Sequence, residues 1–317
     1  VKCWGRNLYG ELGIGNVTQV GDNLDEMGEH QAFTDLGSNL SAVDIDAGTH
    51  HACAAMASGE VRCWGYGYDY RLGQSSTADR GDDSNEMGDN MFALVPPGSE
   101  KFVEVSTSDD ASCALTDAGN VHCWGDSNSY LVHPTTTSDQ YYSSTRTIPL
   151  SDKAIKISLG HEHACALLQS HEVQCWGDNA YGELLQGNTT DNSPHQNDPL
   201  LNLGEGVGAR DIVTGNGFGC VIKTTEEIVC WGRGSHYRTG RSSTNHFGDH
   251  SSEIEVESYA STSPYHRIAQ PYQMDLGPDS NGACIINEAS QVECWGNARI
   301  AGGSNDHGTS WVIDIGS

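Results

Sequence analysis

CAAMASGEVRCWG, residues 53–65, holds two cysteines ten positions apart and follows the second one with Trp-Gly. The same arrangement begins again at Cys113, Cys165, Cys220 and Cys284, and VKCWG at residues 1–5 repeats its second half. The CWG cysteines recur at intervals of 52 to 64 residues. Self-similarity at such a period, with several short strands in each unit, is typical of the blades of a β-propeller. The stretch therefore predicts an all-β propeller.

Each unit reads as one strand followed by a hairpin. Eight positions before the first cysteine stand the apolar residues Ile45, Val105, Ile157, Ile212 and Leu276. Two positions earlier stand Val43, Val103, Ile155 and Met274, with Arg210 as the exception. Apolar residues two apart with polar residues between them predict a strand. A turn such as Ser58-Gly59 then lies midway between the cysteines, which places them on neighbouring strands.

The cysteine spacing has a geometric meaning in such a hairpin. Cysteines that face each other across antiparallel strands have Cα atoms about 4.5 Å apart, near the lower limit for a disulfide. Zinc and redox sites use closer pairs such as CxxC, which the sequence lacks. We predict five structural disulfides, with buried free thiols as the alternative: Cys53–Cys63, Cys113–Cys123, Cys165–Cys175, Cys220–Cys230 and Cys284–Cys294. Five disulfides indicate an oxidising compartment, and Cys3 is left over, unpaired or intermolecular.

Six of the seven tryptophans occupy the CWG positions, one in each unit. A stacking platform for sugars or bases is one interpretation of such a series. Their regular placement beside each cysteine instead favours packing between neighbouring blades, because large aromatic side chains fill the space between facing sheets.

Longer stretches carry a family resemblance. HHACAAMASGEVRCWG, HEHACALLQSHEVQCWGDNAYGELL and CWGRNLYGELGIGN resemble the regulator-of-chromosome-condensation repeat, in a cysteine-paired branch whose members are predicted to be exported. The acidic linkers GDNLDEMGEHQAFTDLG and GDDSNEMGDNMFALVPPG fit the same branch. The resemblance implies a propeller with four-stranded blades, commonly seven. Some loops depart from the pattern, since its glycine at Gly10 and Gly182 becomes Tyr70, Tyr130 and Tyr237 in other units.

We expect one propeller domain over residues 1–317. The blade motifs fall at 1–13, 43–73, 103–132, 155–185, 210–240 and 274–303, and 311–317 is expected to return to the first blade. This predicts six blades, one of them shared by both ends of the chain, with seven as the alternative. The strand that would pair with Cys3 is then missing from the chain, supplied by a neighbouring molecule, or part of a further blade. A neighbour's strand would bring an intermolecular disulfide to Cys3.

The composition excludes some partners. The net charge is −27, from 43 acidic and 16 basic residues, which argues against nucleic-acid binding and suits cationic partners. No apolar run is long enough to insert in a membrane. The first residues already belong to a repeat, so any leader of an exported protein is expected to be missing from this sequence.

The remaining candidate sites come from short motifs. The acidic linkers suggest either a calcium site or a short capped turn, with ligands Asp22, Asp25, Glu26, Asp82, Asp83 and Glu86. Three sequons mark candidate glycosylation sites at Asn16, Asn39 and Asn188. Histidines before the first cysteine are expected to fix loops by hydrogen bonds, with a metal-binding role as the alternative: His50, His51, His161 and His163. The long segment from Arg241 to Pro271 is a candidate partner-contacting loop.

No common catalytic or nucleotide-binding motif occurs, so neither an enzymatic activity nor a cofactor is expected. We hypothesise a non-enzymatic propeller outside the cell or on its surface. It would be a structural subunit that self-associates, as a homo-oligomer or a filament, through its incomplete blade. The alternative is an extracellular recognition module that binds a protein or glycan through loops on one face of the propeller.

Overall fold

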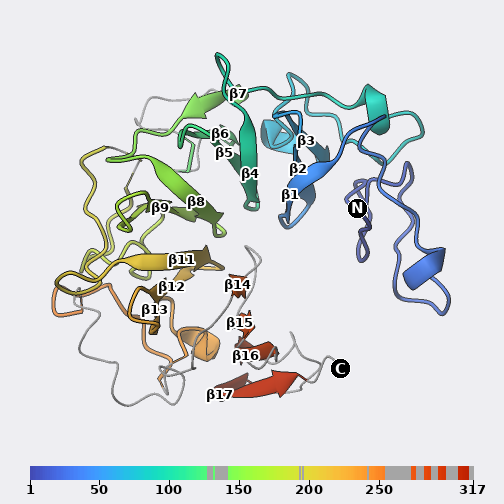
Figure 1. Ribbon diagram of the computed structural model, residues 1–317. Helices are drawn as coiled ribbons and strands as arrows, with labels where there is room; N and C mark the ends of the chain where they lie inside the picture. Colours follow the sequence, from blue (N-terminus) through green and yellow to red (C-terminus); the bar gives the residue numbers. More distant parts are fainter. Residues whose placement is uncertain are drawn as a thin grey trace. The chain divides into compact units, whose positions relative to one another are not determined.

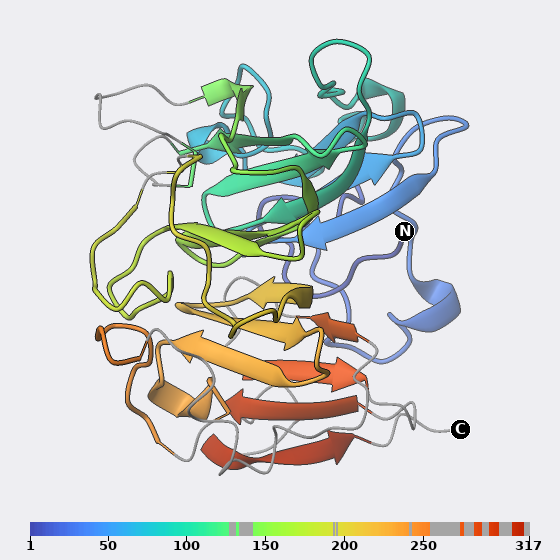
Figure 2. The same ribbon diagram turned by 60° about the vertical axis from the view of Figure 1, so that its left-hand side comes forward.

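The computed structural model in Figures 1 and 2 describes residues 1–126, 131–132, 142–192, 194, 196–240, 243–253, 273–275, 282–286, 292–297 and 306–313. The chain forms two compact units, Val1–Ile148 (unit 1) and Pro149–Ser317 (unit 2). Antiparallel sheets build both units, which confirms the predicted all-β class. Within the part of the chain that the structure describes, no helix is long and apolar enough to span a membrane.

Unit 1 contains two sheets, coloured from blue to green in Figure 1. The first has the order β1-β2-β3 and the second the order β4-β5-β6-β7. The strands are β1 (Ala42–Ala47), β2 (His51–Met56), β3 (Val61–Gly65), β4 (Phe102–Thr107), β5 (Ala111–Thr116), β6 (Val121–Gly125) and β7 (Tyr142–Thr147). Short 3-10 helices lie in the connecting segments: η1 (Gly28–His30), η2 (Tyr68–Tyr70) and η3 (Gly88–Asn90).

Unit 2 contains three sheets with the same plan. Their orders are β10-β9-β8, β11-β12-β13 and β14-β15-β16-β17. The elements are β8 (Ala154–Leu159), β9 (His163–Leu168), β10 (Val173–Gly177), β11 (Ala209–Thr214), β12 (Phe218–Lys223), β13 (Ile228–Gly232), η4 (Ser235–Tyr237), β14 (Gln273–Asp275), β15 (Gly282–Ile286), β16 (Val292–Asn297) and β17 (Asp306–Ile313). Each sheet thus contains the strand and hairpin that the sequence predicts, and β7 and β17 add a fourth strand to two of the sheets.

Every described hairpin sets its two cysteines directly opposite each other. Cys53 pairs with Cys63 and Cys113 with Cys123 in the antiparallel register, and the other three sheets repeat this. The paired cysteines have Cα atoms 4.0 to 4.1 Å apart. The structure joins them as disulfides in the five predicted pairs, the arrangement of the cysteine-paired branch.

The first strand of each blade differs from its predicted alternation. The register shifts between Ala42 and Asp44 in β1, and at the matching place in β4, β8 and β11. The skipped residue is therefore bulged outward, and Val43, Val103 and Ile155 are exposed. The residue two positions later is buried in β4, β8 and β11, as Val105 shows, whereas Ile45 in β1 is 41% exposed. An arginine is tolerated at the bulge of β11 because this position faces solvent.

The CWG tryptophans join one repeat to the repeat before it. Trp64, Trp124, Trp231 and Trp295 are at most 2% exposed. Their indole Nε1–H groups donate to the carbonyl oxygens of Glu11, Arg71, Glu183 and Arg238, respectively. Each acceptor lies eight positions after the CWG cysteine of the preceding repeat. These bonds confirm the predicted packing role for these four tryptophans, whereas Trp4 is 63% exposed.

The last strand corrects one prediction. Residues 311–317 were expected to open a blade shared with the first residues, but β17 pairs antiparallel with β16, with Trp311 opposite Cys294. The alternation of apolar and polar residues in this segment fits either the first or the last strand of a sheet. In this structure it forms the last strand, next to β16. Residues 314–317 lie outside the described residues. The single-domain organisation and the number of blades stay predictions.

We expect the double substitution C113A/C123A to lower the free energy of unfolding by about 2–3 kcal/mol, because the unfolded chain regains the freedom of a short closed loop. Urea unfolding followed by tryptophan fluorescence measures it. The control C3S, which removes a free cysteine, should change the unfolding free energy by less than about 0.5 kcal/mol. A double variant as stable as the wild type would contradict the role of the disulfide.

Candidate functional site

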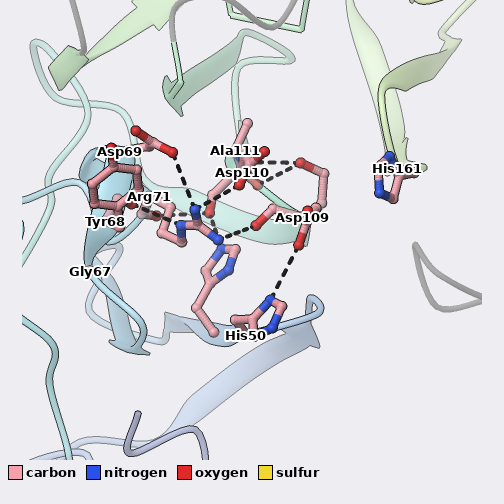
Figure 3. A network of polar contacts seen from close by, with 12 residues as sticks. His50, Gly67, Tyr68, Asp69, Arg71, Asp109, Asp110, Ala111 and His161 are labelled. Carbon is pink, nitrogen blue, oxygen red and sulfur yellow. Dashed lines mark hydrogen bonds and ion pairs between the residues drawn. The ribbon is translucent and has the colours of Figure 1, made fainter.

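Two kinds of loop converge in unit 1 (Figure 3). One kind enters a cysteine hairpin, at residues 48–50 before β2 and 108–110 before β5. The other follows a CWG strand and contains η2. Asp69 and Tyr70 within this helix both have a φ of 57°, a conformation that L-residues seldom adopt. The backbone strain lies at the point where the loops meet, which is common in binding sites.

Arg71 holds these loops together. Its Nη1 donates to the carbonyl oxygen of Asp109 at 2.6 Å, its Nη2 to Asp110 Oδ1 at 2.6 Å, and its Nε to the carbonyl oxygen of Tyr68 at 2.8 Å. The Asp69 carboxylate lies 3.4 Å from Nη2, and Arg71 itself is only 2% exposed. A buried guanidinium with charged and backbone acceptors fixes the geometry of every loop that it touches.

Aromatic rings cover this network. The ring centroids of Tyr9 and Tyr66 are 4.3 Å apart, and Tyr66 stacks on Tyr68 at 5.9 Å. His50 lies 5.9 Å from the Tyr9 ring, and its Nδ1 is 3.3 Å from Asp109 Oδ1. Tyr68 is 52% exposed. We call Tyr9, His50, Tyr66 and Tyr68 the tyrosine platform: a rigid aromatic surface whose outer ring faces solvent.

Acidic groups surround the platform. Burial first, then the neighbouring charges of Asp126 and Asp110, raise the pKa of Asp69 to about 6, although Arg71 opposes this. Burial also raises the pKa of Asp79. One oxygen each from Asp69, Asp110 and Asp126 lies within 4.8 Å of the others, a spacing that a metal ion requires. Arg71 contacts two of these carboxylates, so the chain already supplies a cation to this cluster.

The acidic linkers do not assemble the predicted calcium site. Glu26 Oε2 accepts the backbone N–H groups of Gly21 and Asn23 at 2.8 and 3.1 Å, and Glu86 does the same in the second linker. Bonds from the Asn23 side chain and from these N–H groups lower the pKa of Glu26 to about 2. No metal-spaced set forms, over the described residues, among Asp22, Asp25, Glu26, Asp82, Asp83 and Glu86. The glutamates cap a turn instead.

The other predicted sites lie apart from the platform. The sequon asparagines Asn16, Asn39 and Asn188 are all exposed. Asn16 and Asn188 accept the N–H of the threonine two positions later, each at 2.8 Å, and thereby shape a turn. Cys3 is half-buried, with its Sγ 3.6 Å from Thr34 Oγ1. Most of the predicted contact loop from 241 to 271 lies outside the described residues.

Two of the histidines support the loops as predicted. His51 Nε2 lies 2.8 Å from Ser112 Oγ in the next repeat. Burial, followed by the charges of Arg71 and His50, lowers the pKa of His51 to about 3, so the ring is neutral.

The sequence did not predict a functional role for Arg71 or for the tyrosines of the platform. The signal was present in the loop after CWG, where the family glycine becomes Tyr70 and an arginine follows.

Comparisons with known proteins show which repeats and proteins this chain is similar to. The regulator of chromosome condensation (RCC1) repeat matches residues 42–71, 102–130 and 154–183. The chain is 27% identical to human E3 ubiquitin-protein ligase HERC2 over 220 residues, covering 65% of this chain and 4% of that protein. It is 26% identical to the ultraviolet-B receptor UVR8 of Arabidopsis thaliana over 248 residues, covering 76% of this chain and 50% of the receptor.

A solved structure shows the same fold. Yeast RCC1 (Prp20), crystallised with Kap60 bound, matches with a TM-score of 0.69 at 17% identity, covering 96% of this chain and 68% of that chain. The all-β sheets described above therefore belong to a β-propeller of this type. The chain spans half or less of the length of the two curated relatives.

We expect unit 1 to lose stability as the pH rises from about 4 to about 6. The folded state raises the pKa of Asp69 to about 6, above its unfolded value near 3.9, so the folded state binds more protons in this window. The variant D69N should flatten the fall, measured by urea unfolding at several pH values. D25N, at an exposed site with φ 67°, should keep the wild-type slope. Equal slopes in D69N and wild type would contradict the assignment.

Proposed function

We propose that the chain, whose repeats match the RCC1 repeat, is a protein-recognition propeller that binds through the tyrosine platform. The observation that carries this proposal is the cluster of Tyr9, Tyr66 and Tyr68 on loops fixed by a buried arginine. Tyrosine offers a large contact area and loses little conformational entropy on binding, so it is enriched in binding hot spots. A platform that is already ordered needs little further ordering when a partner arrives.

Charge favours a basic partner. The protein carries a net charge of −27, and Asp69, Asp109 and Asp110 lie at the base of the platform. Opposite charges across an interface steer association and suppress incorrect partners. A polyanion such as nucleic acid would meet repulsion instead. Yeast RCC1, which shares the fold, was crystallised with another protein, Kap60, and this supports a protein partner rather than another ligand class.

The disulfides support an oxidising environment for this module. Five disulfides in one chain persist where reducing systems are absent, as in secreted proteins. We therefore place the module outside the cell or on its surface, where the partner is an extracellular protein or a glycan-bearing one. The exposed Asn16, Asn39 and Asn188 would be accessible to glycosylation there.

A random peptide library displayed on phage tests the platform. Peptides that bind the wild-type protein should be rich in lysine and arginine and should bind the Y66A/Y68A variant at least about tenfold more weakly. The matched control F92A removes another exposed aromatic ring and should bind the selected peptides as tightly as the wild type does. Selected peptides that bind Y66A/Y68A as tightly as wild type would rule out the platform as the recognition surface.

Self-association is a second candidate function, as a structural subunit. Trp4 is 63% exposed, whereas the other five CWG tryptophans are at most 2% exposed, and Phe33 is 71% exposed. Cys3, next to Trp4, is the free cysteine of the chain. Exposed apolar side chains around a thiol support association with another strand, followed by an intermolecular disulfide.

Sedimentation and non-reducing electrophoresis at high protein concentration test this second function. We expect reducible oligomers, which C3S removes from the gel, and weaker association in W4S because the apolar contact is lost. The control V95S alters an apolar side chain that is 63% exposed elsewhere in unit 1 and should leave the oligomers unchanged. A concentrated wild-type protein that stays monomeric with one free thiol would eliminate self-association.

A further inference from the structure

Unit 2 contains a cavity at the loops that correspond to the site in unit 1. It has a volume of about 260 Å³, against about 30 Å³ for one water molecule in the liquid. It is lined by the loops entering β9 and β12 and by the loops after the CWG of β10 and of β13. Its walls are His161, Glu162, His163, Asp178, Tyr181, Glu183, Asn216, Gly217 and Arg233. At the corresponding place in unit 1, Arg71 donates to the carbonyl oxygen of Asp109 and to Asp110 Oδ1.

Residues at equivalent positions, counted from the cysteines, differ between the two sites. Arg71 lies eight positions after its CWG cysteine, and Glu183 occupies this position in unit 2. Asp110 lies three positions before the next hairpin's first cysteine, where unit 2 has Gly217. A Cβ atom added to Gly217 would lie 3.3 Å from Glu183 Oε1. Positions 183 and 217 therefore carry neither the cation nor the carboxylate of the matching positions in unit 1, although Arg233 lines the cavity and Arg238 Nη1 donates to the carbonyl oxygen of Asn216.

A buried histidine in the cavity wall is left without its partner. His163 is 1% exposed, and its Nε2 has no hydrogen-bond partner among the described residues. In unit 1 the same nitrogen of His51 contacts Ser112 Oγ at 2.8 Å, and the residue at the serine's position in unit 2 is Gly219. An unpaired polar atom in a buried side chain is costly unless a ligand or water satisfies it.

The cavity also holds a buried carboxyl group, with an arginine in the same wall. Glu183 is 1% exposed, and its Oε2 accepts the backbone N–H of Tyr181 at 2.7 Å. Burial, then the charges of Asp178 and Asp191, raises the pKa of Glu183 to about 8. Burial and Asp191 likewise raise the pKa of Asp178 to about 6. The guanidinium of Arg233 lies over the Tyr181 ring, 4.7 Å from its centroid.

We propose that this cavity binds the side chain of an arginine from a partner protein. The guanidinium group carries five N–H donors and no acceptor, which suits a wall of carboxyl oxygens and a neutral imidazole nitrogen. His163 is neutral because burial, and then the charge of His161, lowers its pKa to about 3. The Arg71 network shows that these loops can hold a guanidinium when one is present. The inference concerns unit 2 and is independent of the tyrosine platform.

Calorimetric titration with three short peptides tests the ligand class. The sequence acetyl-Gly-X-Gly-amide is used with arginine, lysine or citrulline as X, citrulline being the neutral counterpart of arginine. We expect the arginine peptide to bind wild-type protein at least about tenfold more tightly than the citrulline peptide, because the positive charge is what the cavity recognises. A lysine peptide that binds as tightly as the arginine peptide would overturn the assignment to a guanidinium.

Two glutamate variants locate the binding. E183Q keeps the size of the side chain but removes its ability to carry a negative charge. This variant should bind the arginine peptide at least about tenfold more weakly than the wild type. E205Q makes the same change in charge at an exposed position outside the cavity and should bind like wild type. Y66A/Y68A should also bind the peptide normally, which separates this site from the platform. Wild-type affinity in E183Q would overturn the proposal.

The pH dependence of the wild-type protein gives a test that needs no variant. The charged and titratable groups around Glu183 are His161, Glu162, His163, Asp178, Tyr181, Asp191 and Arg233. In the empty cavity Glu183 holds a proton below about pH 8, and the guanidinium must displace it. The dissociation constant should therefore fall with rising pH, by up to about tenfold per unit between pH 6 and 8. An affinity that is independent of pH in this window would overturn the proposal.

Discussion

The cross-strand disulfide in each hairpin is the constraint on which the rest of the molecule depends. A cysteine that faces its partner leaves a single register for two strands that would otherwise be free to slip by two residues. The tryptophan that follows is then held at a fixed height in the sheet, where its indole reaches the carbonyl of the preceding repeat. The loops before and after the hairpin consequently leave each sheet at equivalent points, and residues counted from the cysteines occupy equivalent places.

This equivalence lets the chain vary the chemistry of its loops without altering the scaffold. The position eight residues after the CWG cysteine always presents its carbonyl to the next tryptophan where that bond is described, whether its side chain is that of Glu11, Arg71, Glu183 or Arg238. The backbone of this position serves packing, so its side chain is free to differ. Arg71 at this position is the cation that contacts Asp69, Asp109 and Asp110 in unit 1, and Glu183 is the carboxyl group beside the cavity in unit 2.

The hairpins were predictable because the cysteine spacing and the turn residues that specify them lie close together in the sequence. Ten residues with a turn midway specify the facing cysteines, and the structure repeats this geometry five times. The bulge in the first strand was not predictable from alternation, since Val43 and Val103 are as apolar as a buried residue; only the arginine at position 210 indicated exposure. The Arg71 network was hidden for another reason. Its partner Asp110 lies 39 residues further on in the next repeat, beyond the reach of any local pattern.

Charge explains how equivalent loops hold a buried arginine in unit 1 and a protonated carboxyl group beside a cavity in unit 2. A protein with 43 acidic and 16 basic residues brings carboxylates together wherever its loops converge, and each such cluster must be neutralised by a cation or by protons. Around Asp69 the chain provides Arg71, which offsets part of the repulsion and leaves a pKa of about 6. Around Glu183 no arginine occupies the equivalent position, and the carboxyl group retains its proton up to about pH 8. A partner's guanidinium would replace that proton, so the free energy of ionising Glu183 is coupled to binding.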